Sequence, residues 1–192
     1  MKRYLALGDS YTIGEGVPEG NRFSDYLVNL PGAGFEKPEI IAVTGWTTSE
    51  LKAGIEQAKP AGVYDLVSLL IGVNNQYRGL HPDDYEQEFA DLLNQAIGFA
   101  GGNKEHVIVL SIPDWGTTPF AEGRNREQIA KEIDQFNAIN KAICSNEGVF
   151  YCDITGLTRD EALKNLLVAD NLHYSAEMYR LWAEKVYREY LA

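Results

Sequence analysis

The sequence predicts an α/β domain in which a parallel sheet is covered by helices on both faces. Apolar runs of strand length alternate along the chain with segments whose apolar residues recur at helical spacing. Two of the runs, DLVSLLIG and HVIVLSIP, are almost entirely apolar, as expected of strands buried on both faces. Alternation of this kind requires right-handed crossovers, and these connections produce a parallel sheet.

Five segments are expected to form the strands: Arg3–Leu7, Glu39–Val43, Asp65–Ile71, His106–Ile112 and Val149–Asp153. We expect a three-layer α/β/α sandwich whose five-stranded parallel sheet has the flavodoxin-like order 2-1-3-4-5. The chain of 192 residues is long enough for one domain with a full core, and no repeat, linker or low-complexity tract divides it. Residues 1–192 are therefore expected to form a single domain.

Stripes of apolar residues mark the helices between these strands. Thr47 and Glu50 have the spacing of a capping box, and Leu51, Ile55 and Ala58 follow on one helical face. Two longer stripes are expected to face the core rather than a ligand: Tyr85, Phe89, Leu92, Leu93 and Ala96, and then Ile129, Ile133, Phe136 and Ile143.

Two more helix starts are expected near the C-terminus. Thr158 with Glu161 predicts a short helix, and Ser175 can cap the last one. The apolar stripe of that last helix consists of Tyr179, Trp182, Val186 and Tyr190.

Composition excludes several classes of partner. The net charge of −11 repels phosphate backbones and anionic membrane surfaces, which disfavours nucleic acid as a partner. No apolar stretch approaches the ~20 residues needed to cross a bilayer. Cys144 and Cys152 are expected to be free thiols, and with no run resembling a signal peptide we expect a cytoplasmic location. No metal site or cofactor is expected, because no cluster of His, Asp or Glu has ligand spacing.

Polar residues and glycines follow the expected strands. The carboxyl ends of parallel strands meet at one edge of the sheet, where ligands bind in open α/β folds. The loops at this edge carry Ser10, Gly45, Asn74, Asn75, Arg78, Asp114, Trp115, Asp170 and His173.

Ser10 follows the first strand in the stretch YLALGDSYTIGEG. A serine hydroxyl becomes a nucleophile only when a base removes its proton. Asp170 and His173, in the stretch DNLH, have a spacing that lets the carboxylate orient the imidazole and leaves one ring nitrogen as the base. A plainer interpretation remains open, in which Ser10 is an N-cap and Asp9 a turn former. DNLH alone is equally compatible with a surface acid and a surface histidine.

Gly45 and Asn74 follow the second and third strands. Acyl transfer places negative charge on the former carbonyl oxygen, and each N–H donor aimed at that oxygen contributes roughly 3 kcal/mol. A glycine lets a substrate oxygen approach its N–H, and an asparagine amide can donate to the same point. A turn glycine and an asparagine that bonds its own loop are the alternatives.

Four blocks together resemble the SGNH, or GDSL-type, hydrolase superfamily: GDS after the first strand, a lone glycine after the second, GVN after the third and DNLH near the C-terminus. The resemblance implies an esterase with a Ser–His–Asp triad. By the same resemblance, Ser10 is the nucleophile, His173 the base and Asp170 its orienter. Ser10, Gly45 and Asn74 are the oxyanion donors.

Two positions depart from the family's pattern. Tyr11 stands where the family often has leucine, and Asn75 where it often has aspartate. Neither change removes a reacting atom, and an asparagine side chain can still bond a turn. Trp115 and Phe120 are candidates for the wall of an acyl or alcohol pocket, or for a satellite apolar cluster under a long loop.

Three alternatives to a simple carboxylic esterase stay open. The same machinery serves a thioesterase or lysophospholipase, or a carbohydrate deacetylase. A catalytically silent flavodoxin-like binding module is the third, but GEGVPEG lacks the spacing of a dinucleotide loop. The absence of a lid-like insertion favours a small-molecule ester with a small or medium acyl group.

Overall fold

The computed structural model describes residues 1–191. Its five strands are all parallel and lie in the order β2-β1-β3-β4-β5, which confirms the predicted topology. The strands are β1 (Tyr4–Gly8), β2 (Glu39–Ala42), β3 (Leu66–Leu70), β4 (Val107–Leu110) and β5 (Phe150–Cys152). Each lies within its expected range, except that β1 continues to Gly8.

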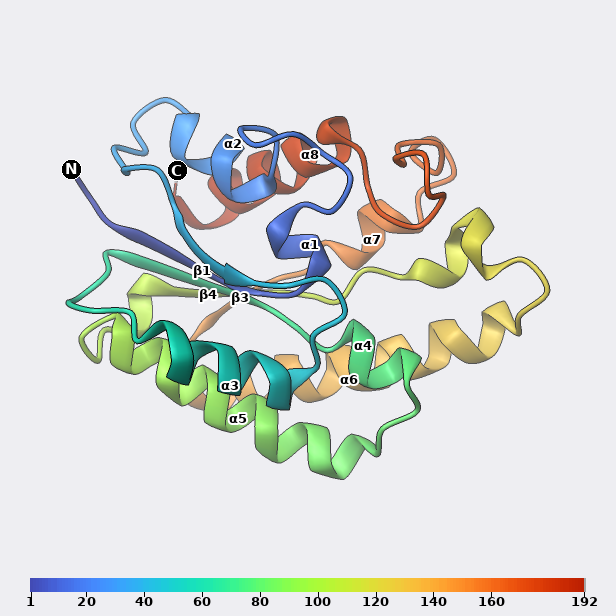
Figure 1. Ribbon diagram of the computed structural model, residues 1–192, viewed down its shortest axis with the longest axis horizontal. Helices are drawn as coiled ribbons and strands as arrows, with labels where there is room; N and C mark the ends of the chain where they lie inside the picture. The colour runs from blue at the N-terminus through green and yellow to red at the C-terminus, as the bar shows by residue number, and fades with distance from the viewer. Residues whose placement is uncertain (192) are drawn as a thin grey trace.

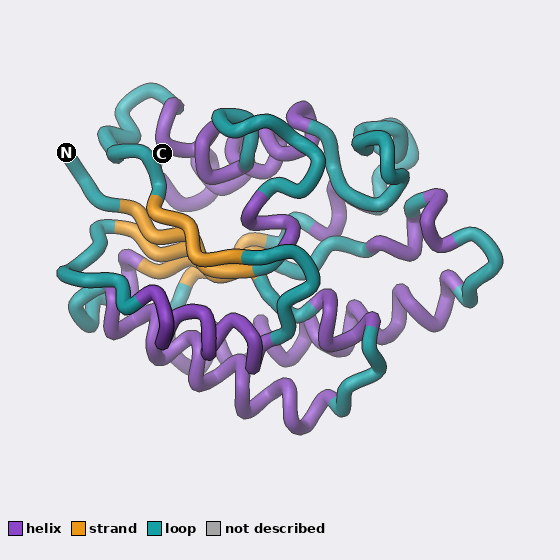
Figure 2. Tube along the Cα trace, viewed as in Figure 1, coloured by secondary structure: helices purple, strands orange, loops and turns teal. Residues whose placement is uncertain are grey.

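Helices cover both faces of the sheet and form the outer two of three layers (Figures 1 and 2). One face carries α1 (Ser10–Ile13), α2 (Phe23–Asn29) and α8 (Ala176–Val186), and the other carries α3 (Thr48–Ala58), α5 (Pro82–Phe99) and α6 (Arg126–Glu147). The short helices α4 (Val73–Tyr77) and α7 (Thr155–Thr158) follow β3 and β5. Four further turns are η1 (Lys104–His106), η2 (Trp115–Thr117), η3 (Pro119–Ala121) and η4 (Tyr187–Leu191).

The core follows from the apolar strands. Every residue of β1, β3 and β4 is buried, and β1 pairs with β2 on one side and β3 on the other. The predicted helical stripes reach the same core, since Leu51, Phe89 and Ile133 are fully buried. Burial of a large aliphatic or aromatic side chain contributes about 1.5–3 kcal/mol, so these stripes fix which face each helix turns inward.

The loops that carry the polar residues meet at one end of the sheet. Figure 1 shows the segments after the strands gathered at the right-hand end of the molecule, away from the two chain ends at the left. The tertiary structure thereby places residues from the first, middle and last parts of the chain side by side.

The prediction of a helix that starts at Thr158 is wrong. The observed helix α7 ends at Thr158, whose hydroxyl donates to the Thr155 carbonyl and accepts from the Asp114 N–H. The Asp160 carboxylate then accepts from the Ala162 N–H two residues on and forms a turn. The expected start at Ser175 is correct, because α8 begins at Ala176.

Two other features of the chain bear on the function. Cys144 and Cys152 are buried free thiols, and burial raises the pKa of each to about 12, which leaves both protonated at neutral pH. No helix within residues 1–191 is long and apolar enough to span a bilayer.

Candidate active site

The turn after β1 brings Ser10 to the cavity wall, and it can form because Gly8 has no side chain. A Cβ at Gly8 would lie 2.1 Å from the Thr12 hydroxyl oxygen and 2.3 Å from the Leu70 carbonyl oxygen. Only glycine lets the strand and the first turn of α1 pack this closely. The cap of α1 is Asp9, so Ser10 is not the N-cap but the first residue of the helix, where its N–H has no acceptor within the helix.

Asp9 is a buried carboxyl group. Its Oδ1 accepts from the Tyr11 N–H at 3.0 Å, while its Oδ2 has no partner among the described residues. Burial raises the pKa of Asp9 to about 7, because an unpaired carboxylate loses its hydration there. Asp9 therefore holds the turn at Ser10 in place partly as a neutral group.

His173 and Asp170 form a bonded pair. The imidazole Nδ1 lies 2.6 Å from Asp170 Oδ2, and Asp170 Oδ1 accepts from the N–H groups of Leu172 and His173, each at 2.9 Å. With Nδ1 committed to the carboxylate, Nε2 is the nitrogen left to take a proton. The segment from Asp170 to His173 thus folds into a ring of hydrogen bonds that fixes the imidazole.

The pKa of Asp170 follows from this ring. Partial burial acts to raise it, but the hydrogen bonds from the His173 ring, the His173 N–H and the Leu172 N–H outweigh burial and lower it below its ordinary value. Asp170 is therefore ionised at neutral pH, in the state that stabilises a charged imidazole.

The other two histidines lie elsewhere. His81 caps α5, where its Nδ1 accepts from the Asp83 N–H at 3.3 Å. His106 lies in η1 just before β4, at the opposite edge of the sheet.

A cavity of about 170 Å³ brings the two ends of the chain together. It is lined by Ser10, Tyr11, Val73, Asn74, Tyr77, Trp115, Phe120, Leu172 and His173. Ser10 and His173 share its wall, although within residues 1–191 no hydrogen bond joins the serine hydroxyl to the imidazole. Such a bond often forms only when substrate is bound.

Three side chains of the β3–α5 segment hold the loop after β2. The Asn74 amide donates to the Trp46 carbonyl at 2.9 Å. The Arg78 guanidinium donates to the Gly45 carbonyl. Gly45 has a φ of +89°, a conformation that a side chain would strain. The Gly45 N–H and the second amide N–H of Asn74 have no acceptor among the described residues, so both are free donors.

Asn75 makes the third of these contacts. Its Oδ1 accepts from the Thr48 N–H at 3.1 Å, and its Nδ2 donates to the Thr48 hydroxyl at 2.6 Å. Because the Thr48 hydroxyl donates its own hydrogen to Glu88, it can only accept from residue 75, and the amide supplies a donor that an ionised aspartate lacks. The departure from the family's aspartate therefore leaves the loop well supported.

Tyr11, the other departure, is part of the site. Its buried ring lines the cavity and lies 5.6 Å from the His173 ring, centroid to centroid. On its far side the ring packs against Tyr174 and Trp182 of the C-terminal segment. Tyr11 thus supports the imidazole from beneath, a role that an aliphatic leucine would fill by packing alone.

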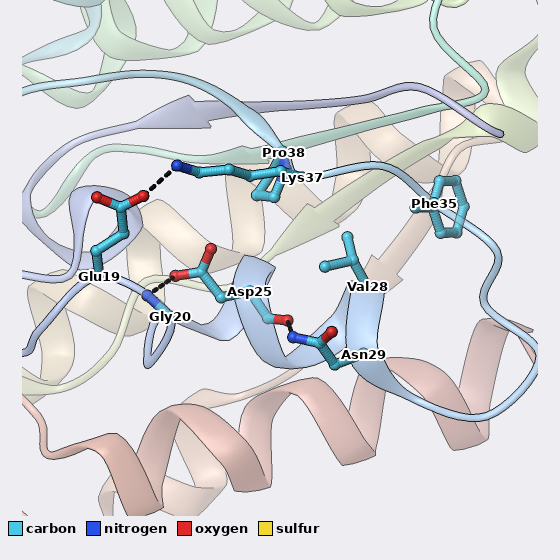
Figure 3. A pocket seen from close by; sticks show the side chains of 8 residues that line it. All are labelled: Glu19, Gly20, Asp25, Val28, Asn29, Phe35, Lys37 and Pro38. Carbon is cyan, nitrogen blue, oxygen red and sulfur yellow. Dashed lines mark hydrogen bonds and ion pairs between the residues drawn. The ribbon is translucent and has the colours of Figure 1, made fainter.

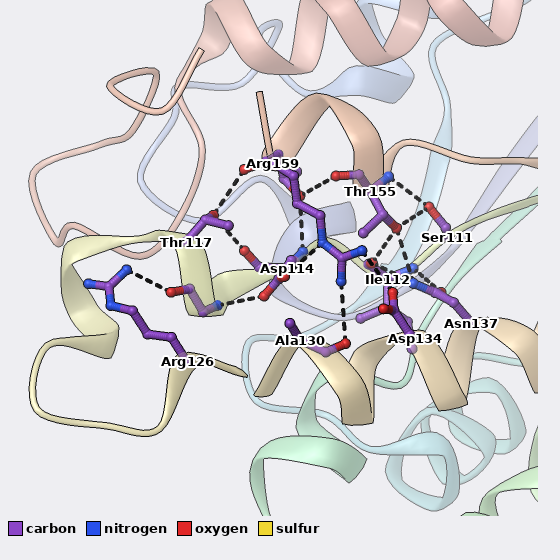
Figure 4. Close-up of polar contacts among 12 residues, drawn as sticks. Ser111, Ile112, Asp114, Thr117, Arg126, Ala130, Asp134, Asn137, Thr155 and Arg159 are labelled. Carbon is purple, nitrogen blue, oxygen red and sulfur yellow. Dashed lines mark hydrogen bonds and ion pairs between the residues drawn. The ribbon is translucent and has the colours of Figure 1, made fainter. Parts of the chain in front are cut away.

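Asp114, expected at this edge, supports the site without lining the cavity. Its carboxylate is 2 % exposed and pairs with Arg159 Nε at 2.8 Å, and it accepts from the Gly116 N–H at 2.9 Å (Figure 4). Arg159 also reaches Asp134 on α6 at 2.8 Å. This pair, in which only the carboxylate is buried, fixes the turn that carries Trp115.

The wall residues Tyr77, Val73 and Leu172 were not foreseen from the sequence. Tyr77 and Val73 lie on α4, a helix of only 5 residues that shows too little periodicity to be recognised. Trp115 and Phe120 do line the cavity, which favours the pocket wall over a satellite cluster. The one signal in the sequence for these missed residues was that they lie in or next to the GVN and DNLH blocks.

A larger crevice lies away from these groups. It has a volume of about 470 Å³ and is lined by Glu19, Gly20, Asp25, Val28, Asn29, Phe35, Lys37 and Pro38 (Figure 3). Glu19 and Lys37 pair across it, and Asp25 is bonded to the Gly20 N–H at 3.0 Å. Its charged groups pair with one another or with the backbone, and no serine, cysteine or histidine is among the residues that line it. In the described part of the chain, no cluster of His, Cys, Asp or Glu is arranged to hold a metal ion.

Comparison with known proteins shows relatives in sequence and in fold. The sequence is 26 % identical to an acetylxylan esterase from Geobacillus stearothermophilus, over 98 % of this chain and 93 % of that protein. The fold is similar to the crystal structure of Axe2, an acetylxylan esterase from the same organism, with a TM-score of 0.73, 22 % identity and coverage of 98 % and 93 %.

A second solved structure has the same fold across its full length. It is a member of the lipolytic protein G-D-S-L family from Veillonella parvula, with a TM-score of 0.72 and 20 % identity, and 98 % of each chain is covered. The pattern of the GDSL-like Lipase/Acylhydrolase family matches residues 6–181, which include every block discussed above. The chain therefore belongs to the GDSL-like lipase/acylhydrolase family, and its reaction is the hydrolysis of an ester.

Proposed function

We propose that the protein hydrolyses carboxylic esters through a covalent acyl-enzyme in which Ser10 is the nucleophile, His173 the general base and Asp170 the residue that orients His173. The observation that carries the proposal is the shared cavity. The bonded Asp170–His173 pair from the end of the chain and Ser10 from its beginning face one space of about 170 Å³.

In this mechanism the Ser10 oxygen attacks the ester carbonyl carbon while His173 Nε2 takes the hydroxyl proton. The electron pair of the C=O bond moves onto oxygen. Collapse of the intermediate breaks the bond to the alcohol, which leaves with the proton from His173. Water then attacks the acyl group in the same way, His173 again moves the proton, and the acid is released from Ser10.

The negative oxygen of the intermediate requires donors. The N–H groups of Ser10 and Gly45 and the amide of Asn74 are the ones we assign to it. Support comes from the free Gly45 N–H and the second free N–H of Asn74. Each such donor contributes about 3 kcal/mol when it is held in place before the reaction.

The dimensions of the cavity favour a small or medium acyl group. Sites for larger ligands usually enclose about 300–1,000 Å³, whereas this cavity has about 170 Å³ and apolar walls formed by Val73, Trp115 and Leu172. Esters with acyl chains of two to four carbons are therefore expected to react faster than those with eight or more.

A sugar acetate is the second candidate substrate. Two observations favour it: the relative at 26 % identity is an acetylxylan esterase, and the rings of Tyr77 and Phe120 at the cavity are 44 % and 40 % exposed. An exposed aromatic face beside a nucleophile is suited to packing against a sugar ring.

The proposal is tested by the Ser10→Ala variant with p-nitrophenyl acetate as substrate. We expect hydrolysis to fall to the background rate while circular dichroism and the thermal midpoint stay near those of the wild type, because the change removes one oxygen from a residue at the cavity wall. Acetylated xylo-oligosaccharides, thioesters and longer acyl esters form the panel that separates the candidate substrates. Full activity of the alanine variant would refute the assignment of the nucleophile.

A further inference from the structure

Three aromatic rings form one side of the cavity. Tyr77 comes from α4, Trp115 from η2 and Phe120 from η3. The Tyr77 ring lies 5.3 Å from that of Trp115 and 6.4 Å from that of Phe120, and the Trp115 and Phe120 rings are 6.0 Å apart, centroid to centroid. The three rings therefore surround a common point at the rim of the cavity.

The guanidinium of Arg124 lies against all three rings, although Arg124 is not itself among the residues that line the cavity. Its central carbon is 5.1 Å from the Tyr77 ring, 5.4 Å from the Trp115 ring and 5.8 Å from the Phe120 ring. Its Nη2 donates to the Tyr77 hydroxyl at 3.2 Å. Attraction to the rings holds the cation in place but uses none of its other N–H donors.

The charge of Arg124 is not neutralised by the protein. Arg78, Arg159 and Arg180 each pair with one or two carboxylates, whereas within residues 1–191 Arg124 makes no ion pair and is exposed. The chain as a whole has 28 acidic against 17 basic residues, a balance that repels anions from most of its surface. Arg124 is therefore an exposed cation beside three rings of the cavity wall, in a protein whose overall charge is negative.

The elements around Arg124 are fixed while its own side chain is accessible. Trp115 Nε1 donates to Gln76 Oε1 at 2.7 Å, and the Phe120 N–H donates to the Asn171 carbonyl at 3.1 Å. On the other side of the turn, Arg126 donates to the Gly116 carbonyl at 2.7 Å (Figure 4). Arg124 is thus presented on a rigid frame that touches the DNLH loop.

We propose that Arg124, held by Tyr77, Trp115 and Phe120, forms a binding site for an anionic group, a carboxylate or a phosphate, carried by the ester substrate. A guanidinium presents parallel N–H donors that match both anions, and the aromatic faces orient it without competing for those donors. The inference rests on the proposed function, since the site is useful only beside a working nucleophile. It assigns the protein a preference for charged over neutral esters of the same size.

The experiment measures kcat/KM for a pair of aryl acetates, 4-acetoxybenzoate and its neutral methyl ester, and repeats the comparison with 4-acetoxyphenyl phosphate. The variants are Arg124→Gln, which removes the charge, and Arg124→Lys, which keeps it. Lys131→Gln is the matched control, because Lys131 is an exposed cation on α6 that makes no ion pair within the described chain. For each variant we take the ratio of kcat/KM for the charged ester to kcat/KM for the neutral ester. Comparing this ratio between variants cancels the different reactivity of the two leaving groups.

We expect Arg124→Gln to lower kcat/KM for at least one charged ester about fivefold and for the neutral ester less than twofold. Arg124→Lys should retain more than half of the preference, Lys131→Gln should leave it unchanged, and salt should weaken it in the wild type. The carboxylate and phosphate arms tell which anion is preferred. An equal effect of Arg124→Gln on charged and neutral esters would overturn the inference while leaving the proposed function intact, whereas an active Ser10→Ala variant would remove the proposed function itself.

Discussion

The guanidinium of Arg78 donates a hydrogen bond to the carbonyl oxygen of Gly45, which joins the end of α4 to the loop after β2. Arg78 also pairs with Glu50 at 3.3 Å, and Glu50 in turn accepts from the Thr47 N–H at 2.8 Å. Two neighbouring peptides of one loop are therefore tied to a single ion pair. Because the Gly45 carbonyl is fixed, the direction of the peptides on either side of it is restricted as well.

Arg78 is accordingly expected to be a positioning residue for the oxyanion donor. The Arg78→Gln variant should lose about tenfold in kcat with KM changed less than twofold, since the interaction acts on the transition state rather than on bound substrate. Affinity for a boronic acid that forms a tetrahedral adduct with Ser10 should fall by the same factor. The measurement is steady-state kinetics together with inhibition constants.

Lys52→Gln is the matched control for Arg78. Lys52 pairs with Asp91 at 3.2 Å and is 41 % exposed, close to the 45 % of Arg78, but its pair joins α3 to α5 away from the loop. It should leave kcat unchanged. A kcat for Arg78→Gln equal to that of this control would show that the Gly45 peptide needs no anchor.

His173→Ala is expected to reduce activity more than Asp170→Asn. Removal of the base typically costs about 10⁶ in kcat, and loss of the orienting carboxylate about 10⁴. In this protein the Oδ1 of the new asparagine can still accept from the Leu172 and His173 N–H groups, so the loop stays folded. Its NH₂ group, however, is a donor where His173 Nδ1–H needs an acceptor. Rates on p-nitrophenyl acetate for the two variants decide the ranking, and an equal or greater loss for Asp170→Asn would contradict it.

Asp9 makes the stability of the protein depend on pH. Its pKa is raised by burial to about 7, against 3.8 when unfolded, so the folded state binds the proton more tightly. The contribution of this group to the free energy of unfolding is complete below pH ~4. It is lost as the pH rises through 7, and the total loss is on the order of 4 kcal/mol. Asp9→Asn should therefore raise the thermal midpoint by several degrees at pH 8 and flatten its pH dependence.

Thermal unfolding at pH 5 and pH 8 tests this expectation. Glu56→Gln serves as the control, because Glu56 is an exposed acid on α3 and should not alter the slope between the two pH values. If Asp9→Asn leaves that slope as it is in the wild type, the carboxyl group of Asp9 is ionised in the folded protein at both pH values.

The fold and the order of the strands were predictable from local patterns. Buried parallel strands such as β3 and β4 must be apolar throughout, and helices such as α5 must turn one stripe of residues toward them, so both leave a periodic record in the sequence. The five residues proposed for catalysis were chosen because each follows a strand at the same edge of the sheet. The helix misplaced at Thr158 shows the limit, since a tertiary contact with Asp114 determines where that hydroxyl points.

By itself the sequence determined the α/β class and the family, and it supplied the candidate residues for the chemistry, because these depend on residue type and on spacing along the chain. Only the tertiary structure decided which side chains share the cavity, that Asn75 and Arg78 hold the loop at Gly45, and that Arg124 lies among three rings. The physical reason is distance along the chain. Contacts between residues that are tens of positions apart leave no periodic trace, and they form only when packing of the core brings the loops to one edge.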